Sequence, residues 1–464
     1  MQSDRYAAED AWVSAAAGGV YRHGVSASPP IEPSSRCPLR IEAAAVADAD
    51  RVVAPAVLLI ARDGVVEAVA SPAEIGAPDG RETVRRPRGV IVPGLVNAHA
   101  HLDLTSLGPR PFDAGAGFKA WADMVRRERP SEPEAVAESV RHGVEACLQG
   151  GTAIVGDIAG NRGLAAFESL RAHGVRGVSY LEVFGIGRAE PAGCEFVESL
   201  RSRIEFPGPT RLGISPHASY SCGDRLFEAA ASLGLPLATH LSETVEELEF
   251  SRSGGGPLAD LLRVVGAWSE SLRGWSTSPI ERLASRLLRS GAAIAHGNYL
   301  DDADLDTLAA TSRDASRPLG LVYCPRASAY FGHPVAGRSP HRYRELLARG
   351  VPVALGTASL ICLDTPDRLS VLDEMRVLHR RDRVEPRLLL AMATVHGAAL
   401  LGEDRDRVVL ARGASPEGVL SIEVAAVNTP PPGDGDAWLM AAIDTESRPE
   451  WIVPPRWITG ERAR

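Results

Sequence analysis

The chain has 464 residues, of which 45% are hydrophobic. This length fits two or three domains, or one α/β barrel with an added segment. Asp and Glu total 59 against 50 Lys and Arg, a net charge of −9, which argues against nucleic-acid binding through overall charge. The apolar runs are far shorter than the roughly 20 residues that a membrane span needs. We therefore expect neither a nucleic-acid partner nor a membrane partner.

The six cysteines lie far apart in the sequence and form no Cys-x-x-Cys pair. Spacing of this kind is typical of reduced cysteines and not of a disulfide framework. The N-terminal residues lack a basic segment followed by an apolar one, as a secretion signal would have. The sequence therefore predicts a cytoplasmic location.

Residues 1–38 show little patterning and predict an irregular N-terminal extension. From 39 to 88, short apolar runs alternate with turns such as Asp63-Gly64, a dipeptide that favours a tight hairpin. This segment predicts short paired strands.

Eight short apolar runs then alternate with helical patterns. The runs cover 89–96, 152–156, 175–183, 211–215, 235–238, 292–295, 319–323 and 351–355. Helices are expected at 133–148, 164–173, 224–233, 279–289, 302–310 and 343–349. Continuous apolar strands alternating with helices are typical of a closed parallel (β/α)8 barrel of the TIM type, which we place at 89–406. An open doubly wound sheet is the alternative, but no Gly-x-Gly-x-x-Gly motif opens it.

The C-terminal part predicts one helix over 386–401 and then strands at 408–411, 418–427 and 437–443. We expect 39–88 and 407–460 to combine into a composite β-sandwich beside the barrel.

Histidines follow four of the eight predicted strands. His99 and His101 follow the first strand, and His217, His240 and His296 follow the fourth, fifth and sixth. Active-site residues of such barrels come from the carboxyl ends of the strands. The two imidazoles of a His-x-His pair lie on one side of a strand, and catalytic zinc usually takes three protein ligands.

We predict that His99, His101 and His240 bind one divalent metal, with Zn²⁺ favoured over Fe²⁺ and Mn²⁺. Glu243 follows His240 closely and is a candidate proton carrier. The alternative is a solvated glutamate at a helix start, because three more glutamates follow it.

Five segments together carry a family resemblance: 93–102 (PGLVNAHAHL), 215–220, 240–244, 295–300 and 324–326. They resemble the amidohydrolase superfamily, in its cytosine deaminase-like and chlorohydrolase-like branch, which includes S-adenosylhomocysteine and aminofutalosine deaminases. The resemblance covers roughly residues 55–402. It implies a (β/α)8 barrel, a small sandwich built from both chain ends and one metal held by His99, His101 and His240.

By the same resemblance, Glu243 and His296 take part in catalysis, while His217 and Arg326 contact the substrate. For Arg326 the alternative is an ion-paired arginine. Trp121 is a further candidate for covering the substrate, although a buried aromatic side chain is the alternative.

The sequence departs from the family pattern at strand eight. The family strand ordinarily ends in Gly-Thr-Asp-Ser, whereas this chain has Gly-Thr-Ala-Ser with Ala358 at the aspartate position. Relatives usually carry Ser or Thr and then His after Cys-Pro-Arg, and here Ala327-Ser328 stands. Because alanine cannot accept a proton, Glu243, Asp364 or Asp157 would have to take over that role. For Asp364 the alternative is a helix cap.

Two functions remain open. The first is a metal-dependent hydrolase of non-peptide C–N bonds that deaminates an amino-substituted heterocycle or a nucleoside-like compound. The second is a catalytically impaired amidohydrolase paralogue that binds a small molecule or a partner. In both cases we expect a small-molecule ligand, and we leave a homodimer open.

Overall fold

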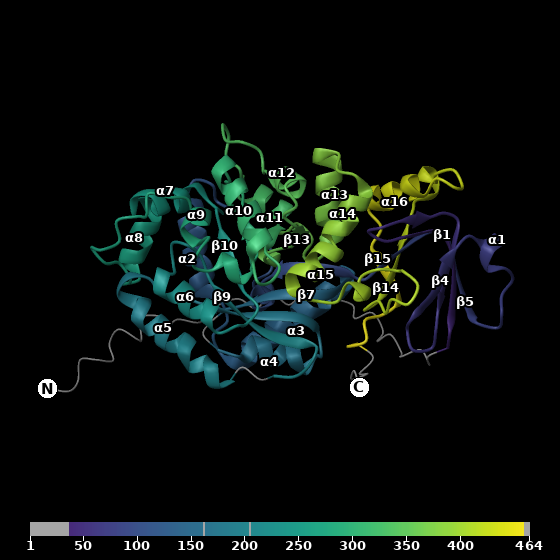
Figure 1. The fold of residues 1–464 in the computed structure, drawn as a ribbon, viewed down its shortest axis with the longest axis horizontal. Helices are drawn as coiled ribbons and strands as arrows, with labels where there is room; N and C mark the ends of the chain where they lie inside the picture. Colours follow the sequence, from purple (N-terminus) through teal and green to yellow (C-terminus); the bar gives the residue numbers. More distant parts are fainter. Residues whose placement is uncertain (1–36, 161–162, 204–205, 459–464) are drawn as a thin grey trace.

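The computed structural model describes residues 37–160, 163–203 and 206–458. Residues 1–36 of the predicted N-terminal extension therefore lie outside the described residues. Figure 1 shows an α/β barrel beside a smaller part built around a β-sheet, arranged along the longest axis of the molecule. No helix among the described residues is both long and apolar enough to span a membrane.

The barrel consists of eight parallel strands. They are β6 (Leu95–Ala100), β7 (Thr152–Ala159), β8 (Arg176–Val183), β9 (Thr210–Pro216), β10 (Ala238–Leu241), β11 (Ala293–His296), β12 (Gly320–Tyr323) and β13 (Val353–Leu355). Hydrogen bonds join them into two four-stranded sheets, β6 to β9 and β10 to β13. Isolated parallel bridges, Ile214 with Leu237 and Ala100 with Ala358, connect the sheets at both edges. The predicted barrel class is confirmed.

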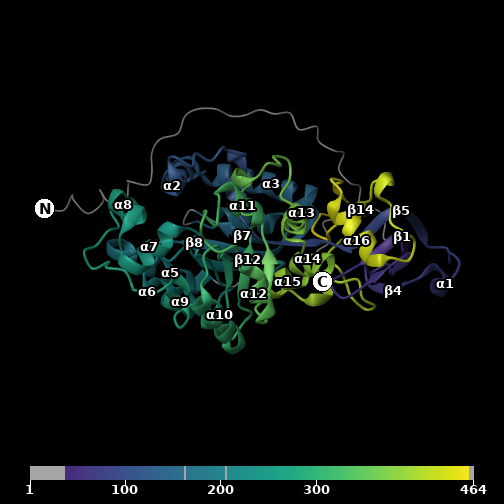
Figure 2. The same cartoon turned by 90° about the horizontal axis from the view of Figure 1, so that it is seen from above.

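Six of the predicted helices occur between these strands. They are α3 (Pro133–Gln149), α4 (Ala165–Ala172), α6 (Asp224–Ser232), α9 (Pro279–Leu283), α10 (Asp302–Asp314) and α12 (Tyr343–Ala348). In Figure 2 helices α3, α6 and α10 lie around strands β7, β8 and β12. Helix α9 is shorter than predicted, and a separate 3-10 turn follows at Leu288–Ser290.

The remaining helices were not predicted, apart from the 386–401 segment. They are α1 (Pro72–Ile75), α2 (Gly117–Glu128), α5 (Glu190–Ser199), α7 (Val245–Ser253), α8 (Gly256–Val264), α11 (Pro325–Tyr330) and α13 (Val371–Asp382). The expected single helix over 386–401 is two helices, α14 (Pro386–Met392) and α15 (Val395–Leu401). The helix is interrupted where the carbonyl of Ala393 accepts a hydrogen bond from the Val96 amide of the barrel.

Strands from both ends of the chain form one seven-stranded sheet with the order β15-β14-β5-β1-β3-β4 and β2 paired to β1. They are β1 (Leu39–Ala47), β2 (Val52–Val53), β3 (Ala56–Ile60), β4 (Val66–Ala70), β5 (Glu82–Pro93), β14 (Val419–Glu423) and β15 (Pro449–Val453). The N-terminal and C-terminal segments pair with each other, and hydrogen bonds join all seven strands into a single sheet.

Three strand predictions were wrong in this part of the chain. Residues 437–443 belong to helix α16 (Gly435–Asp444), whose N-terminus is capped by the Asp434 side chain. Residues 408–411 are irregular, because the Leu410 amide donates to the Asp48 carboxylate and not to a neighbouring strand. The run 89–96 is divided between β5 and β6 at Gly94, where a Cβ atom would lie 2.6 Å from that of Ala153.

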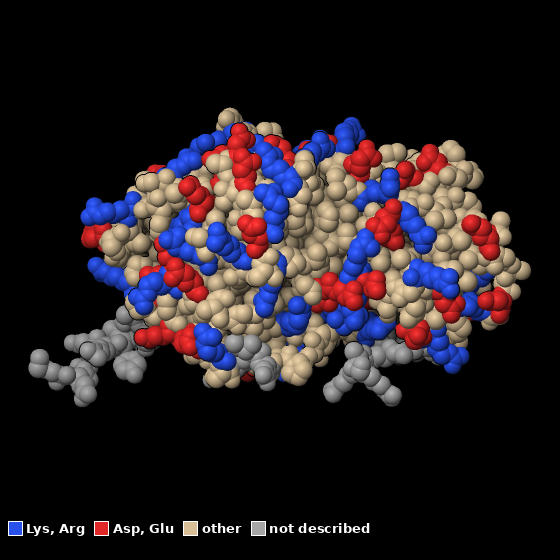
Figure 3. Space-filling model, in the orientation of Figure 1, with Lys and Arg blue, Asp and Glu red and all other residues tan. Residues whose placement is uncertain are grey.

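The surface carries charges of both signs. On the face shown in Figure 3, acidic and basic side chains of the described residues are interspersed over both parts of the molecule. This distribution agrees with the small net charge per residue and shows no broad basic area on the described part of that face.

Candidate active site

Five histidines meet at the carboxyl ends of the barrel strands. His99 lies in β6, with His101 directly after it, and His217, His240 and His296 follow or end β9, β10 and β11. Ring centroids are 4.9 Å apart for His99 and His240, and 5.0 Å apart for His217 and His240. The strand-end histidines therefore converge on one place, as the chain order of strands and histidines predicted.

The nitrogen atoms of this cluster lie close enough together to be candidate metal ligands, and the three-histidine group contains His296 in place of the predicted His101. Nε2 of His101 lies 3.4 Å from Nε2 of His240, and one ligand atom from each of His99, His240 and His296 lies within 4.8 Å of the others. Nδ1 of His240 lies 3.0 Å from the carbonyl oxygen of His217. A carbonyl only accepts, so His240 carries its proton on Nδ1 and presents a free electron pair on Nε2.

The same cluster contains polar atoms that the protein leaves unsatisfied. Nε2 of His99 and Nδ1 of His101 are buried without a hydrogen-bond partner. Burial, and secondarily the neighbouring imidazoles, hold the pKa of His99 and of His101 well below 6.5. The rings are therefore neutral, which is the form that binds a metal ion. This donor set fits one divalent metal.

Glu243 lies beside His296 in the site. Its Oε1 is 3.4 Å from Nε2 of His296, and burial together with the charge of Glu247 raises the pKa of Glu243 to about 8. Helix α7 begins at Val245 with Thr244 as its cap, so Glu243 precedes the helix. The interpretation of Glu243 as a solvated glutamate at a helix start does not fit its burial of more than nine-tenths.

Several contacts that the sequence did not predict hold the backbone of Glu243. Glu247 accepts from the Glu243 amide at 2.8 Å and from the Ser219 hydroxyl at 2.6 Å. Asn298 donates to the Glu243 carbonyl at 3.0 Å and accepts from Ser328 at 2.8 Å. Ser328, noted in the sequence as a departure from the family, thus supports this side of the site. The i to i+4 spacing of the two glutamates was the available signal.

Ala358 lies next to His99 just after β13. Its amide donates to the His99 carbonyl at 3.0 Å, its side chain is buried, and its φ is +54°. Asn and Asp adopt this left-handed conformation more readily than alanine does. The backbone at position 358 therefore suits an aspartate, while the methyl group present cannot accept a proton.

The two aspartates predicted as substitutes have other partners. Asp157 is fully buried and its Oδ1 accepts from the Leu102 amide at 2.9 Å. Burial, followed by the nearby Asp103, raises the pKa of Asp157 to about 7. Asp364 is 86% exposed and lies 3.4 Å from the Arg326 guanidinium. Neither carboxylate belongs to a three-ligand group found among the described residues.

Arg326 forms hydrogen bonds and ion pairs with acidic side chains. Its Nε donates to Glu374 at 2.6 Å, its backbone amide donates to the same carboxylate at 2.9 Å, and NH1 donates to Thr365 at 2.9 Å. Glu374 is fully buried. The ion-paired alternative for Arg326 therefore matches the structure.

Trp121 belongs to a group of aromatic side chains. It lies on α2, edge-on to Phe331 at 4.9 Å and stacked on Phe118 at 5.7 Å between ring centroids. The ring is partly buried within an apolar cluster that also contains Ala358. The buried-aromatic alternative for Trp121 therefore fits its contacts.

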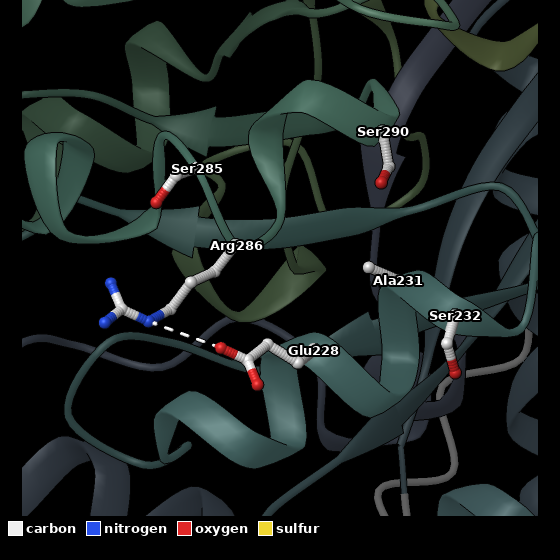
Figure 4. Close-up of a pocket in the computed structure, with 6 residues that line it drawn as sticks. All are labelled: Glu228, Ala231, Ser232, Ser285, Arg286 and Ser290. Carbon is white, nitrogen blue, oxygen red and sulfur yellow. Dashed lines mark ion pairs between the residues drawn. The ribbon is translucent and has the colours of Figure 1, made fainter.

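A separate surface cavity of about 560 Å³ lies on the outside of the barrel. Figure 4 shows its lining, which comes from α6 and from the segment between α9 and β11, with Arg286 and Glu228 forming an ion pair of 3.7 Å. None of the five histidines lines this cavity. We therefore place the candidate active site at the histidine cluster.

A TIM-type barrel with a buried histidine cluster at the ends of its strands defines a metal-dependent hydrolase. The model of the Amidohydrolase family matches residues 90–414. The chain belongs to this family, and the predicted class of enzyme is confirmed.

The chain is similar to curated deaminases. It is 27% identical over 387 residues to a 5-methylthioadenosine/S-adenosylhomocysteine deaminase of Haloarcula marismortui, covering 77% of this chain and 79% of that protein. It is 29% identical over 365 residues to an aminodeoxyfutalosine deaminase of Deinococcus radiodurans, covering 73% and 79%. An adenosine deaminase of Xanthomonas campestris, solved with bound zinc, shares the fold with a TM-score of 0.67 at 20% identity, covering 93% and 95%.

Proposed function

We propose that the protein hydrolytically deaminates the purine ring of an adenosine-type compound. The observation that carries the proposal is the position of Glu243, a buried carboxylic acid 3.4 Å from His296 and beside the metal-binding histidines. The similarity to deaminases of adenosine-like compounds supports the substrate class.

We further propose zinc as the metal, with His99, His101 and His240 as its ligands. When bound, a divalent metal there supplies Lewis acidity and lowers the pKa of water. The three neutral imidazoles are the common zinc ligands, and zinc in a structural neighbour supports this choice over iron or manganese.

Glu243 supplies the proton for the reaction. Its pKa of about 8 keeps the carboxyl group protonated at neutral pH, so it can donate to the ring nitrogen next to the carbon that bears the amino group. That protonation draws electrons from the carbon, where oxygen from water replaces the amino group and ammonia leaves. His296 holds the Glu243 carboxyl in place from one side, and Asn298 and Glu247 hold its backbone. His217 is the proposed substrate contact.

The second candidate function, a catalytically impaired paralogue that binds a small molecule, is favoured by the methyl group of Ala358 beside His99. The two functions differ in ammonia release. Zinc-loaded protein is incubated with adenosine, 5-methylthioadenosine, guanine and cytosine, with Glu243→Gln as the matched control. We expect ammonia from the adenosine compounds in the unaltered protein only. One bound zinc per chain with no release from the panel would exclude the deaminase and support the binding function.

We also propose that residues 89–406 form the catalytic unit, with 39–88 and 407–460 as an accessory domain. The sheet that combines strands from both chain ends supports this division. A cytoplasmic location is supported by six cysteines that are all free. Whether the protein forms a homodimer is tested by its molar mass, measured by gel filtration with light scattering.

A further inference from the structure

We propose a second cation position on the other side of His240, formed by Glu182, His217 and His240. A carboxylate oxygen and two imidazole nitrogens of these residues all lie within 4.8 Å of one another. Glu182 and His240 are buried, and His217 is partly buried. Two histidines and one glutamate form a ligand set of catalytic zinc sites, in which a water completes the coordination.

Hydrogen bonds fix both imidazoles in the form that binds a metal. Nδ1 of His217 lies 2.7 Å from the Ser221 hydroxyl, which itself donates to the Ala218 carbonyl. Ser221 therefore accepts from His217, and the proton of that ring is on Nδ1. The His240 ring also carries its proton on Nδ1, because that atom donates to the His217 carbonyl. Both Nε2 atoms then carry a free electron pair, and that of His217 lies 3.9 Å from Oε1 of Glu182.

The distances suit an ion between the ligands. Nε2 of His217 and Oε1 of Glu182 are 3.9 Å apart, too far for a hydrogen bond. Two ligand atoms that each lie about 2.0 Å from a tetrahedral zinc ion are about 3.3 Å apart. Shifts of a few tenths of an ångström by His217 and Glu182 would therefore bring this pair to the spacing of two zinc ligands.

The charges around Glu182 also favour a cation. Arg129 donates to Asp103 at 2.7 and 3.1 Å and to Oε2 of Glu182 at 2.9 Å. Asp103, Asp157 and Glu182 are buried carboxyl groups, and Arg129 is the guanidinium that pairs with two of them. Its charge is offset by Asp103, so Oε1 of Glu182 remains available to a cation. Arg129 packs against Gly160, where a Cβ atom would collide with the guanidinium.

The two cation positions compete for one atom. Nε2 of His240 has a single electron pair, so a cation binds either with Glu182 and His217 or with His99 and His101. On the His99 side, strand eight offers the methyl group of Ala358 and no carboxylate. On the His217 side, β8, the third strand of the barrel, carries Glu182. The site thus binds one cation at a time, and Glu182 supplies a carboxylate ligand that strand eight lacks.

The test is the binding of Co²⁺ to metal-free protein. Equilibrium dialysis measures the affinity and the number of bound ions, and the visible absorption of Co²⁺ reports on its ligands. The variant His99→Ala/His101→Ala removes the first position. We expect it to retain about one equivalent of Co²⁺. Adding Glu182→Gln should weaken Co²⁺ binding at least 10-fold. Removing a residue that only hydrogen-bonds to a metal ligand already lowers metal affinity by about 10- to 100-fold, and Glu182 is proposed as a ligand itself. Adding Glu195→Gln, an exposed glutamate on α5, should leave binding unchanged.

Two results would overturn the proposal: a double variant with native circular dichroism that binds no Co²⁺, or one that binds equally well after Glu182→Gln. If the double variant does not fold, cobalt anomalous diffraction from the unaltered protein decides the question. Density next to Glu182 supports the proposal, and density confined to His99 and His101 refutes it. Because binding is measured without substrate, absence of deaminase activity would contradict the proposed function alone.

Discussion

Introducing a carboxylate at position 358 tests how much the methyl group of Ala358 limits the proposed activity. In Ala358→Asp the new side chain starts from a backbone with φ of +54°, which Asp adopts more readily than Ala. Its amide already donates to the His99 carbonyl at 3.0 Å, so the position is fixed relative to the metal-binding histidines. We expect little backbone rearrangement in the zinc-loaded variant.

The expected gain follows from the role of the carboxylate. General-base assistance contributes about 10²- to 10⁴-fold to a rate. This corresponds to about 2.7–5.4 kcal/mol of transition-state free energy at 1.36 kcal/mol per factor of ten. We expect kcat/KM for adenosine-type substrates to rise within this range. Without metal, a buried carboxyl group with no partner should lower the free energy of unfolding by about 1–3 kcal/mol.

The assay is ammonia release by the zinc-loaded protein, with urea unfolding in the presence and absence of zinc. Ala358→Asn is the matched control, because asparagine shares the backbone preference and the size of aspartate but is not a base. Equal activity of the Asp, Asn and unaltered proteins, each with one bound zinc, would refute the reasoning and show that Glu243 suffices.

Four further predictions concern Glu243, Glu247 and Arg326. Glu243→Gln should lower kcat/KM by about 10²- to 10⁴-fold. In the unaltered protein kcat/KM should fall as the pH rises through about 8, where Glu243 loses its proton. A pH-independent kcat/KM would contradict the role of Glu243 as proton donor. Because the pKa of Glu243 is raised, the folded state binds more protons than the unfolded state between pH 4.5 and 8. The free energy of unfolding should therefore decrease as the pH rises across that window. The decrease should be smaller in Glu243→Gln. Glu247→Gln removes the like charge that raises the pKa of Glu243, so the alkaline limb of the kcat/KM profile should move to lower pH; an unmoved limb would refute the coupling. Arg326→Ala leaves the buried Glu374 without its guanidinium and should lower the free energy of unfolding by about 3–5 kcal/mol with KM nearly unchanged; a large rise in KM at constant stability would instead make Arg326 a substrate contact.

The barrel and its histidine cluster could be predicted because both depend on local sequence. Buried parallel strands are largely apolar on both faces, so β7, β8 and β12 appear as mostly apolar runs. Because all the strands point the same way, residues that follow them meet at one end of the barrel. The chain order of His99, His217, His240 and His296 was therefore enough to place them together.

The errors arose where distant segments decide the structure. Residues 437–443 form a short apolar run that periodicity alone assigns to neither strand nor helix; the Asp434 cap and packing beside the sheet decide for α16. The break between α14 and α15 depends on a hydrogen bond to Val96, about 300 residues earlier in the chain. The packing of α16 beside the sheet and the hydrogen bond to Val96 are absent from any local pattern, whereas the Asp434 cap is local and could be read from the sequence.

Long-range ion pairs explain what was missed in the site. Arg129 ends a helix that the sequence pattern did not reveal, and its partners Asp103 and Glu182 lie on or after two different barrel strands. Arg326 appeared in a family motif as a substrate contact, but its partner Glu374 lies 48 residues later on α13. Whether an arginine faces substrate or a buried carboxylate depends on such pairings, which sequence spacing does not specify.

The position of the carboxylates relative to His240 determines what the substitution at strand eight does to the chemistry. Glu243 lies beside His296, whereas Glu182 lies beside His217 and is tied to Arg129. A cation bound by Glu182 would still have His240 as a ligand but would lie farther from position 358. There the cation would be held by Glu182, His217 and His240, and it would lower the pKa of water. A substrate ring that keeps its contact with Glu243 would then need a different orientation from one served by an aspartate on strand eight. With a cation at the proposed position, Glu182 on strand three would supply the acidic ligand that Ala358 on strand eight cannot.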